Sequence, residues 1–569
     1  MNIQKIHRST FFICLLFVSA ILLFLLIPSG NVAKAQSESG LSMSGHVYDS
    51  QGQPIQDAEV ALYLDNAQET SLIAKTNQDG VFLFDYPTQD VVSMKLKISH
   101  PHFHSVDWVA EKEDIETLLT EGGLRIEDFT LEREISAGFW IAAAVFSGVL
   151  VLIITERMHS TLAALLGAGT LLFISLAGRV FGEKLFIYDF DRAISYIDFN
   201  VIFLVLGMMI IVGTIERTGI FQWIAYHSYR ISGGRLWLLV VILMLFTSVA
   251  SALLDNVTTM LLVAPISIQI ALALGINPLS LLIPEMLASN VGGIATLIGT
   301  PNNILIGSYA GLGFNDFLRE LTPGVLLVQL VLTGYVLLVF RSQLRKAAET
   351  QSEELLNLLE ENAQITEPEV LKRAGIVFLG VLFFFILGEQ FHLVPAVTAI
   401  IGAPVTLVVV KADVDEIMRV VDWSTLLFFM ALFMIVGAIQ EVGLISMIAT
   451  GINSLVGGNL TVGTLVVAWG TGLLCLLVPT IPLTAALLPI VGFLSQTIPG
   501  VGNALYYSLS MGSALGANNS LIGATNNMVT AGIAKRAGFP ISYREFIKIG
   551  LPAAILTLIV GSIYLLLRF

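Results

Sequence analysis

Beyond Arg133 the chain is a series of long apolar runs separated by short polar stretches. A helix needs about 20 mostly apolar residues to cross a bilayer, and most of these runs approach or exceed that length. In the first half the runs cover 138–155, 160–178, 200–216, 236–274, 279–309 and 323–340. In the second half they cover 373–389, 395–410, 423–440, 462–496, 503–534 and 549–567. This pattern predicts a polytopic α-helical membrane protein.

The two halves carry the same landmarks in the same order. At an offset of 224 residues, LIGTPNN (297–303) aligns with LIGATNN (521–527). The same offset aligns Asp198 with Asp422, Gly213 with Gly437, Gly219 with Gly443, Pro265 with Pro489 and Gly292 with Gly516. Glu156-x-x-His159 also matches Glu389-x-x-His392, at an offset of 233; these residues are expected at span ends. Self-similarity of this kind predicts a duplicated unit.

Counting the crossings of each unit predicts how the two copies are oriented. Each unit has five spans plus a hairpin, 236–274 in the first and 462–496 in the second, which we expect to be re-entrant. An odd number of crossings gives the copies opposite orientations. Fifteen Lys and Arg residues then fall on the predicted cytoplasmic side and five on the outer side, as the positive-inside rule requires. The sequence therefore predicts two inverted-topology repeats, 135–341 and 372–569, joined by a cytoplasmic linker, 342–371.

The segment before residue 135 is different in kind. Residues 1–36 have a basic start, an apolar run and an Ala-Lys-Ala site at 33–35, which predicts a signal peptide or a signal anchor. Residues 37–134 alternate between apolar and polar positions and contain frequent turn residues, which predicts a small β-sandwich outside the cytoplasm. His100, His102 and His104 alternate along a predicted strand of this domain. Either a metal site or a loop cluster near Pro101 accounts for them.

The composition narrows the function. The chain is 55% hydrophobic and 13% charged, whereas a soluble domain has about 25% charged residues. Its two cysteines, Cys14 and Cys475, lie in apolar runs and indicate neither a disulfide framework nor a structural zinc site. A phosphate-binding loop is absent, and no catalytic pair or metal cluster stands out. We therefore expect an integral membrane protein of a prokaryotic plasma membrane that is not an enzyme, binds no nucleic acid and has no cofactor.

Polar stretches interrupt the apolar runs at 255–259, 290–303, 480–484 and 518–527. A helix that breaks inside a bilayer leaves backbone groups unpaired, which is tolerated only where the break faces protein or water. Transporters built from inverted repeats place such breaks around their ions and substrates. Buried amides need partners, so we expect the paired asparagines Asn302-Asn303 and Asn526-Asn527 to contact an ion or substrate. For Gly213, Gly437, Gly292 and Gly516 we favour helix packing.

Asp255 is the carboxylate at the tip of the first hairpin. An acidic residue inside a membrane generally handles an ion, a proton or a substrate. It also has the position of an N-cap for the helix that follows, and the two roles are compatible. Its counterpart in the second copy is Pro479. A role that needs a carboxylate at the hairpin tip is therefore expected in the first copy and not in the second.

Three stretches of the membrane part carry a family resemblance. LDNVTTMLLVAPI (254–266), SNVGGIATLIGTPNNILI (289–306) and ALGANNSLIGATNNMVTAGIAKRAG (514–538) resemble the ion transporter superfamily, whose members share a citrate-transporter-like domain. This group includes divalent-anion/sodium symporters, sodium/proton antiporters, arsenite permeases and the P protein. The resemblance covers about 137–569. In the N-terminal domain, GHVYDSQGQPIQDAEVALY and TNQDGVFLF resemble carboxypeptidase regulatory-like modules.

The resemblance implies two pseudo-symmetric ion sites beside one substrate. The first site would comprise Asp255, Asn256, Thr258, Gly299, Thr300 and Asn302; the second would comprise Thr480, Thr484, Asn519, Gly523, Thr525 and Asn526. The interruptions add Thr259, Asn290, Asn303, Asn518 and Asn527 to the candidates. Sodium would bind at Asn256 and Asn519. The symporters carry Ser-Asn-Thr at each tip, and its absence here argues against sodium at the second tip and against a dicarboxylate substrate.

The sequence thus favours secondary active transport of a small ion, either an anion or Na⁺ in exchange for H⁺. The resemblance implies an elevator-like movement coupled to Na⁺ or H⁺, in a homodimer. An uncoupled anion channel would use the same helix breaks. A membrane sensor is a third alternative, although the sequence contains no output domain.

Overall fold

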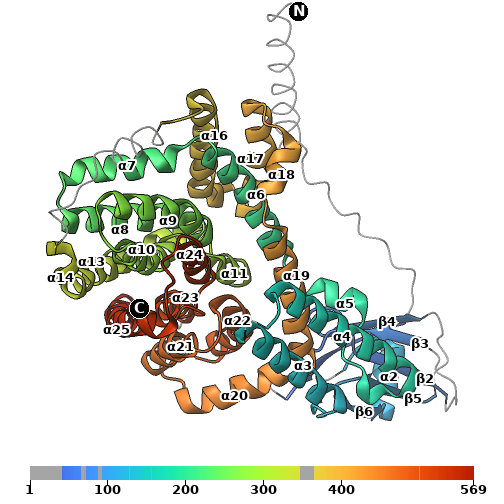
Figure 1. Ribbon diagram of the computed structural model, residues 1–569. Coiled ribbons are helices and arrows are strands. Elements are labelled where there is room, and N and C mark those ends of the chain that lie inside the picture. Colours follow the sequence, from blue (N-terminus) through green and yellow to red (C-terminus); the bar gives the residue numbers. More distant parts are fainter. Residues whose placement is uncertain are drawn as a thin grey trace, which may run out of the picture. The chain divides into compact units, whose positions relative to one another are not determined.

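The computed structural model describes residues 41–50, 52–65, 72–86, 92–126, 128–155, 157–346, 364–391, 393–498, 500 and 502–569. The predicted signal segment, most of the linker, Glu156 and His392 lie outside these residues. The chain separates into two compact units, Met1–Arg133 and Glu134–Phe569 (Figure 1). Each unit is described by itself.

The first unit is built from two four-stranded sheets. One has the order β4-β1-β7, with β8 paired to β1, and the other has the order β3-β2-β5-β6. The bounds are β1 Leu41–Asp49, β2 Glu59–Leu64, β3 Leu72–Lys75, β4 Val81–Tyr86, β5 Met94–His100, β6 Phe103–Val109, α2 Lys112–Glu121, β7 Gly123–Arg125 and β8 Phe129–Leu131. Buried residues of both sheets, among them Phe82, Leu96 and Ile98, form one core. Alternating burial along β5 is the pattern of a strand with one face on that core.

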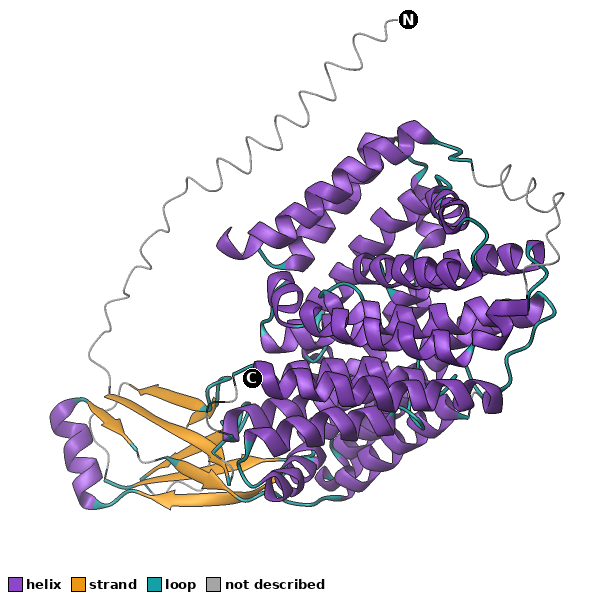
Figure 2. Ribbon diagram, turned by 90° about the vertical axis from the view of Figure 1, so that its left-hand side faces the viewer, coloured by secondary structure: helices purple, strands orange, loops and turns teal. Residues whose placement is uncertain are grey.

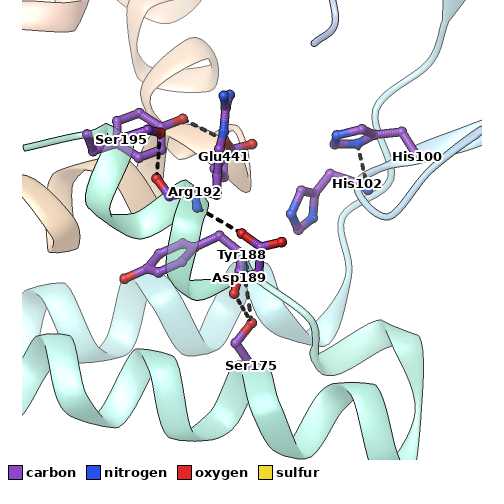
Figure 3. A network of polar contacts seen from close by, with 9 residues as sticks. His100, His102, Ser175, Tyr188, Asp189, Arg192, Ser195 and Glu441 are labelled. Carbon is purple, nitrogen blue, oxygen red and sulfur yellow. Dashed lines mark hydrogen bonds and ion pairs between the residues drawn. The ribbon is translucent and has the colours of Figure 1, made fainter. Parts of the chain in front are cut away.

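The expected alternation of three histidines along one strand is wrong. His100 ends β5, His102 lies in the turn, and His104 belongs to β6. The turn is formed because Pro101, which cannot donate a backbone hydrogen bond, ends the strand. The backbone N–H of His102 donates to Nδ1 of His100 at 3.3 Å, as the right-hand side of Figure 3 shows. Among the described residues no group of three potential metal ligands is present.

The second unit is helical (Figure 2). In the first half the helices are α3 Ala137–Ile154, α4 Ser160–Phe181, α5 Phe190–Ser195, α6 Phe199–Glu216, α7 Ile220–Ser232, α8 Leu236–Leu253, α9 Asn256–Ala273, α10 Leu279–Gly292, α11 Pro301–Ala310, α12 Phe314–Glu320, α13 Thr322–Val339 and α14 Arg341–Lys346. In the second half they are α16 Pro368–Leu387, α17 Pro395–Val410, α18 Val414–Val420, α19 Trp423–Glu441, α20 Leu444–Val456, α21 Leu460–Leu474, α22 Thr480–Thr497, α23 Ala504–Gly516, α24 Thr525–Arg536 and α25 Tyr543–Arg568. Ten helices of the described chain are long and apolar enough to cross a membrane.

The predicted apolar runs agree with the helices, and the short helices between them were not predicted. α7 and α20 are examples, each flanked by glycines in the left-handed conformation, such as Gly219 (φ 79°) and Gly443 (φ 86°). Polar residues such as Gln222 and His227 interrupt the apolar pattern of α7, which hid this helix from a search for membrane spans. α8 and α9, the arms of the first hairpin, have 18 residues each.

The same elements occur in both halves, and the halves interlock. α6 packs against α17 of the other half, and α19 packs against α4 (Figure 1). Likewise α9 packs against α24, and α22 against α11. The unit therefore contains one group of helices around α6 and α19 and another around the helix breaks. Each group is assembled from both halves of the sequence.

Candidate functional site

Each half contains a helix that breaks and restarts. In the first half α10 continues into a 3₁₀ turn, Gly293–Ala295, and the chain restarts as α11. In the second half α23 continues into the 3₁₀ turn Ala517–Asn519 and restarts as α24. The loops between turn and restart are short and buried. They contain the repeated LIG phrase, and the asparagine pair follows each of them.

The second asparagine of each pair ties the loop together. Nδ2 of Asn303 donates to the carbonyls of Gly293, Ile294 and Thr296 at 2.8–3.2 Å. Nδ2 of Asn527 donates to the equivalent carbonyls of Ala517 and Ser520, at 2.9 and 3.1 Å. These bonds satisfy backbone groups that the helix break leaves without helical partners. Asn303 and Asn527 therefore have a structural role in both copies.

The first asparagine of each pair lacks such contacts. Asn526 is fully buried, and neither Oδ1 nor Nδ2 has a hydrogen-bond partner within the described chain. Oδ1 of Asn302 is also buried and without a partner there. The same holds for Oγ1 of Thr484 and Oδ1 of Asn519. Buried polar groups are normally paired, so these four side chains are the ones best suited to receive a ligand.

A chain of amides joins three of the four interruptions. Nδ2 of Asn256, at the first hairpin tip, donates to Oδ1 of Asn290 at 3.1 Å. Nδ2 of Asn290 in turn donates to Oδ1 of Asn518 at 2.8 Å and to Oδ1 of Asn527 at 3.3 Å. The two copies are therefore connected by side-chain hydrogen bonds at their helix breaks. Asn518 also donates to the carbonyl of Leu287 at 3.3 Å.

Two glycines allow the hairpins to approach the loops. A Cβ atom on Gly299 would lie 2.6 Å from the carbonyl oxygen of Gly293 and 2.8 Å from that of Ser251. A Cβ atom on Gly523 would lie 2.8 Å from the carbonyl oxygen of Ala517. The backbone N–H of Thr480, at the second tip, donates to the carbonyl of Gly523 at 3.1 Å. The expected packing role of Gly292 and Gly516 is also confirmed, because any side chain there would clash with the neighbouring helix.

The helix starts around the site differ between the copies. Oδ1 of Asp255 accepts from the backbone N–H groups of Val257 and Thr258 at 2.8 and 2.9 Å, and its Oδ2 accepts from the Thr258 hydroxyl. Thr300 caps α11 in the same way, accepting from the N–H of Asn302 at 3.4 Å. In the second copy Pro479 and Ala524 precede α22 and α24, and neither start has a side-chain cap. The partial positive charge of those two helix starts is not offset by a capping side chain.

The tip of the first hairpin contains further polar groups. The hydroxyl of Thr259, which is fully buried, donates to the carbonyl of Asp255 at 2.9 Å. The carboxylates of Asp255 and Glu216, the last residue of α6, lie close enough to repel each other. Thr525, in contrast with the other candidates of the second copy, is exposed.

Outside the helix breaks, three ion pairs of the described residues connect the halves, and one of them joins Arg568 to Glu320. The other two are equivalent to each other. Arg192 of α5 pairs with Glu441 at the end of α19, and Arg217 after α6 pairs with Glu416 of α18. The four positions are related by the 224-residue offset, with arginine in the first copy and glutamate in the second. Figure 3 shows Arg192 and Glu441 with Asp189, Tyr188 and Ser175.

Tyr196 reinforces the first of these pairs. Burial, followed by the Glu441 carboxylate, raises the pKa of Tyr196 well above its usual value. Its phenol therefore stays protonated and donates to Glu441 at 2.6 Å.

A family model described as a citrate transporter matches residues 150–512, more than half of the chain. The chain belongs to the citrate transporter family. It is 35% identical over 431 residues to an uncharacterized transporter of Mycobacterium tuberculosis, covering 75% of this chain and 98% of that protein. It has the same identity and coverage with the 46 kDa membrane protein of Mycobacterium leprae.

Two further comparisons support the membrane fold. This citrate transporter family member is 31% identical over 506 residues to the human P protein, covering 75% of this chain and 59% of the P protein. The crystal structure of the YdaH transporter of Alcanivorax borkumensis matches with a TM-score of 0.50 and 15% identity, over 72% of this chain and 98% of that chain. At that identity the match shows the fold alone. The predicted superfamily is confirmed, and the protein is a transporter in a lipid bilayer.

One buried acid, Glu285, was not among the residues predicted from the sequence. Glu285 of α10 is 1% exposed, and the hydroxyl of Ser267 in α9 donates to its Oε1 at 2.6 Å. The sequence feature that could have revealed Glu285 is a single charged residue inside an apolar run. It was overlooked because it lies between the interruptions and not in one of them.

Proposed function

We propose that the protein is a secondary active transporter that moves a small anion by an elevator-like mechanism coupled to Na⁺ or H⁺. The family is described as citrate transporters, so citrate is the first substrate to test. The helix group around the breaks would carry the anion, and the group around α6 and α19 would remain as scaffold. No cofactor takes part beyond the coupling ion.

One observation carries this proposal: Asn526 is fully buried, and among the described residues neither of its polar side-chain atoms has a hydrogen-bond partner. It lies in the first turn of a helix without a side-chain cap. A carboxylate placed there would accept from Nδ2 of Asn526 and would face the positive end of α24. The second uncapped start, that of α22, adds a further positive end nearby, since Thr480 is hydrogen-bonded to Gly523. The second copy therefore supplies the anion-binding half of the site.

The first copy is suited to a cation. Asp255 supplies a carboxylate next to Asn256, and Glu216 adds a second negative charge nearby. Sodium prefers such oxygen ligands, and a proton on Asp255 would serve the same purpose. Because a carboxylate at the tip also suits cation exchange, Na⁺/H⁺ antiport is the second candidate function.

The remaining architecture follows from the duplication. The two copies would have opposite orientations in a prokaryotic plasma membrane, with the N-terminal unit, as a β-sandwich, outside the cytoplasm. A pseudo-two-fold relation between the copies, which inverted repeats have, accounts for the matching contacts of α6 with α17 and of α19 with α4. Homodimer assembly would hold the scaffold still while the other helices move.

Uptake into proteoliposomes tests the proposal. Purified full-length protein is reconstituted, and radiolabelled citrate, succinate, sulfate, arsenite and chloride are offered with an inward Na⁺ or H⁺ gradient. The proposal predicts accumulation of one anion above its external concentration, abolished by dissipating the gradient. Entry that only equilibrates across the membrane would instead identify a channel. Na⁺ uptake driven by a pH gradient, without any anion, would favour antiport.

A further inference from the structure

Glu285 has one hydrogen bond for two carboxyl oxygens. Ser267 donates to Oε1, while Oε2 is buried and has no partner in the described part of the chain. A carboxylate in an apolar interior is strongly unfavourable unless a cation or several donors compensate its charge. With a single hydroxyl partner, the neutral acid is the form that fits this environment.

The helices packed against α10 supply no compensating charge. These are α8, α9, α13, α23 and α24. Their titratable side chains are Tyr335, Tyr506, Tyr507, Lys535 and Arg536. Tyr335 donates to the carbonyl of Ile549, and the two basic residues are exposed at the end of α24. None of the ion pairs of the described residues includes Glu285.

The second copy shows that the fold does not need this polar pair. At the same offset of 224 residues, Glu285 corresponds to Leu509 and Ser267 to Val491. Leu509 and Val491 are 0% and 2% exposed, so they fill the equivalent space with apolar atoms. Replacing a buried polar pair by packed apolar residues is generally neutral or stabilising. An acid at this position therefore calls for a functional explanation.

We propose that Glu285 is a proton-binding site of the helix group that surrounds the breaks, separate from the asparagine-lined anion site. The acid is protonated in the conformation described here. When that group of helices moves and water reaches α10, the proton passes from the carboxyl oxygen to water, and a carboxylate remains. Ser267 donates to the carboxylate and can accept from the acid, so it is a partner in both forms. The coupling role rests on the proposed transport function; the protonation itself does not.

Infrared difference spectroscopy tests the protonation without any substrate. Purified full-length protein in liposomes is titrated from acidic to alkaline pH, and the C=O stretch of protonated carboxyl groups is followed in H₂O and D₂O. We expect a band that persists at neutral pH in the wild type and in Asp255→Asn and is lost in Glu285→Gln. If the wild type has no such band at neutral pH, or if Glu285→Gln retains it, the proposal is overturned.

Transport by the same variants tests the coupling role. Glu285→Gln should lose accumulation of citrate driven by a pH gradient and keep citrate exchange between two equal pools. The double variant Glu285→Leu with Ser267→Val has the residues found at the equivalent positions of the second half. It should fold with unchanged thermal stability and should also lose accumulation of citrate driven by a pH gradient. Wild-type accumulation in either variant would reject the role. If the wild type moves no anion, the proposed function fails, and the infrared band still decides on the proton site.

Discussion

The two copies of the membrane unit share their backbone contacts and differ in the polar groups at the same places. The Thr296 hydroxyl donates to the carbonyl of Ala252, and the equivalent Ser520 hydroxyl donates to that of Leu476 at 3.3 Å. Ser251 donates to the carbonyl of Ser289, and at the equivalent position Cys475 contacts that of Ser513. These contacts hold the helix break together in both copies.

The differences concern charge and capping. The first copy has Asp255 and Glu285, where the second has Pro479 and Leu509. At the hairpin tips and the helix breaks, side chains cap the starts of α9 and α11 in the first copy, whereas the starts of α22 and α24 in the second copy have no side-chain cap. Under the proposed function, the first copy, with its two acids, would bind protons or cations, and the second copy, with its uncapped helix starts, would bind the anion. The comparison teaches that symmetric packing does not require symmetric chemistry.

The largest effect is expected from the glycines that both copies need. Gly299→Ala and Gly523→Ala each force a Cβ atom against backbone carbonyls that have no room to move. Overpacking of this kind costs about 1–3 kcal/mol. We expect a lower melting temperature in detergent and poor insertion. Gly334→Ala is the matched control, since nothing lies within 4 Å of its added Cβ. Equal stability of all three variants would contradict the packing described here.

The two asparagines of a pair should respond in different ways. Asn527→Ala removes hydrogen bonds to Ala517 and Ser520 and should lower stability by about 1–3 kcal/mol, since a typical hydrogen bond contributes about 0.5–1.5 kcal/mol. Asn526→Ala should leave the melting temperature unchanged and abolish transport. Thermal unfolding and uptake on the same preparations check both statements. The distinction fails if Asn526→Ala unfolds as easily as Asn527→Ala.

Asp255, at the tip of the first hairpin, should affect the coupling of transport to the ion gradient and not the folding of the protein. Asp255→Asn removes the charge, and its Oδ1 can still accept from the N–H groups of Val257 and Thr258. The helix start is therefore retained, and we expect transport to lose its dependence on the Na⁺ gradient, while the response to a proton gradient through Glu285 remains. Uptake with and without each gradient measures this. Unchanged dependence on the Na⁺ gradient would remove Asp255 from the coupling mechanism.

The smallest effects are expected from the two equivalent ion pairs between the copies, Arg192–Glu441 and Arg217–Glu416. The Arg192–Glu441 pair is more buried than the Arg217–Glu416 pair, with 27% and 11% against 33% and 53% side-chain exposure. Exposed pairs contribute about 0–1 kcal/mol, and the attraction between two charges is stronger where less water surrounds them. Double-mutant cycles with alanine, followed by thermal unfolding, should give the larger coupling energy for Arg192 and Glu441. The reverse order would show that burial does not decide their strength.

Much of the fold followed from the sequence, since long apolar runs define spans and the 224-residue repeat aligns them. The interruptions also located the helix breaks. The roles within an asparagine pair did not follow, because Asn526 and Asn527 are identical in type and only the backbone decides which one faces the carbonyls. The histidines of the N-terminal unit were misplaced because alternation by two does not reveal a turn. Glu285 was missed because burial of a single charge depends on packing, which no local pattern displays.

Citrate binding by two variants tests the asymmetry of the site most directly. Isothermal titration of citrate into wild type, Asn526→Ala and Asp255→Asn is measured with and without Na⁺ and at two pH values. The account predicts that Asn526→Ala no longer binds citrate under any condition, whereas Asp255→Asn binds it without dependence on Na⁺. Equal loss of binding in both variants, or Na⁺-dependent binding retained by Asp255→Asn, would contradict the division of roles between the two copies.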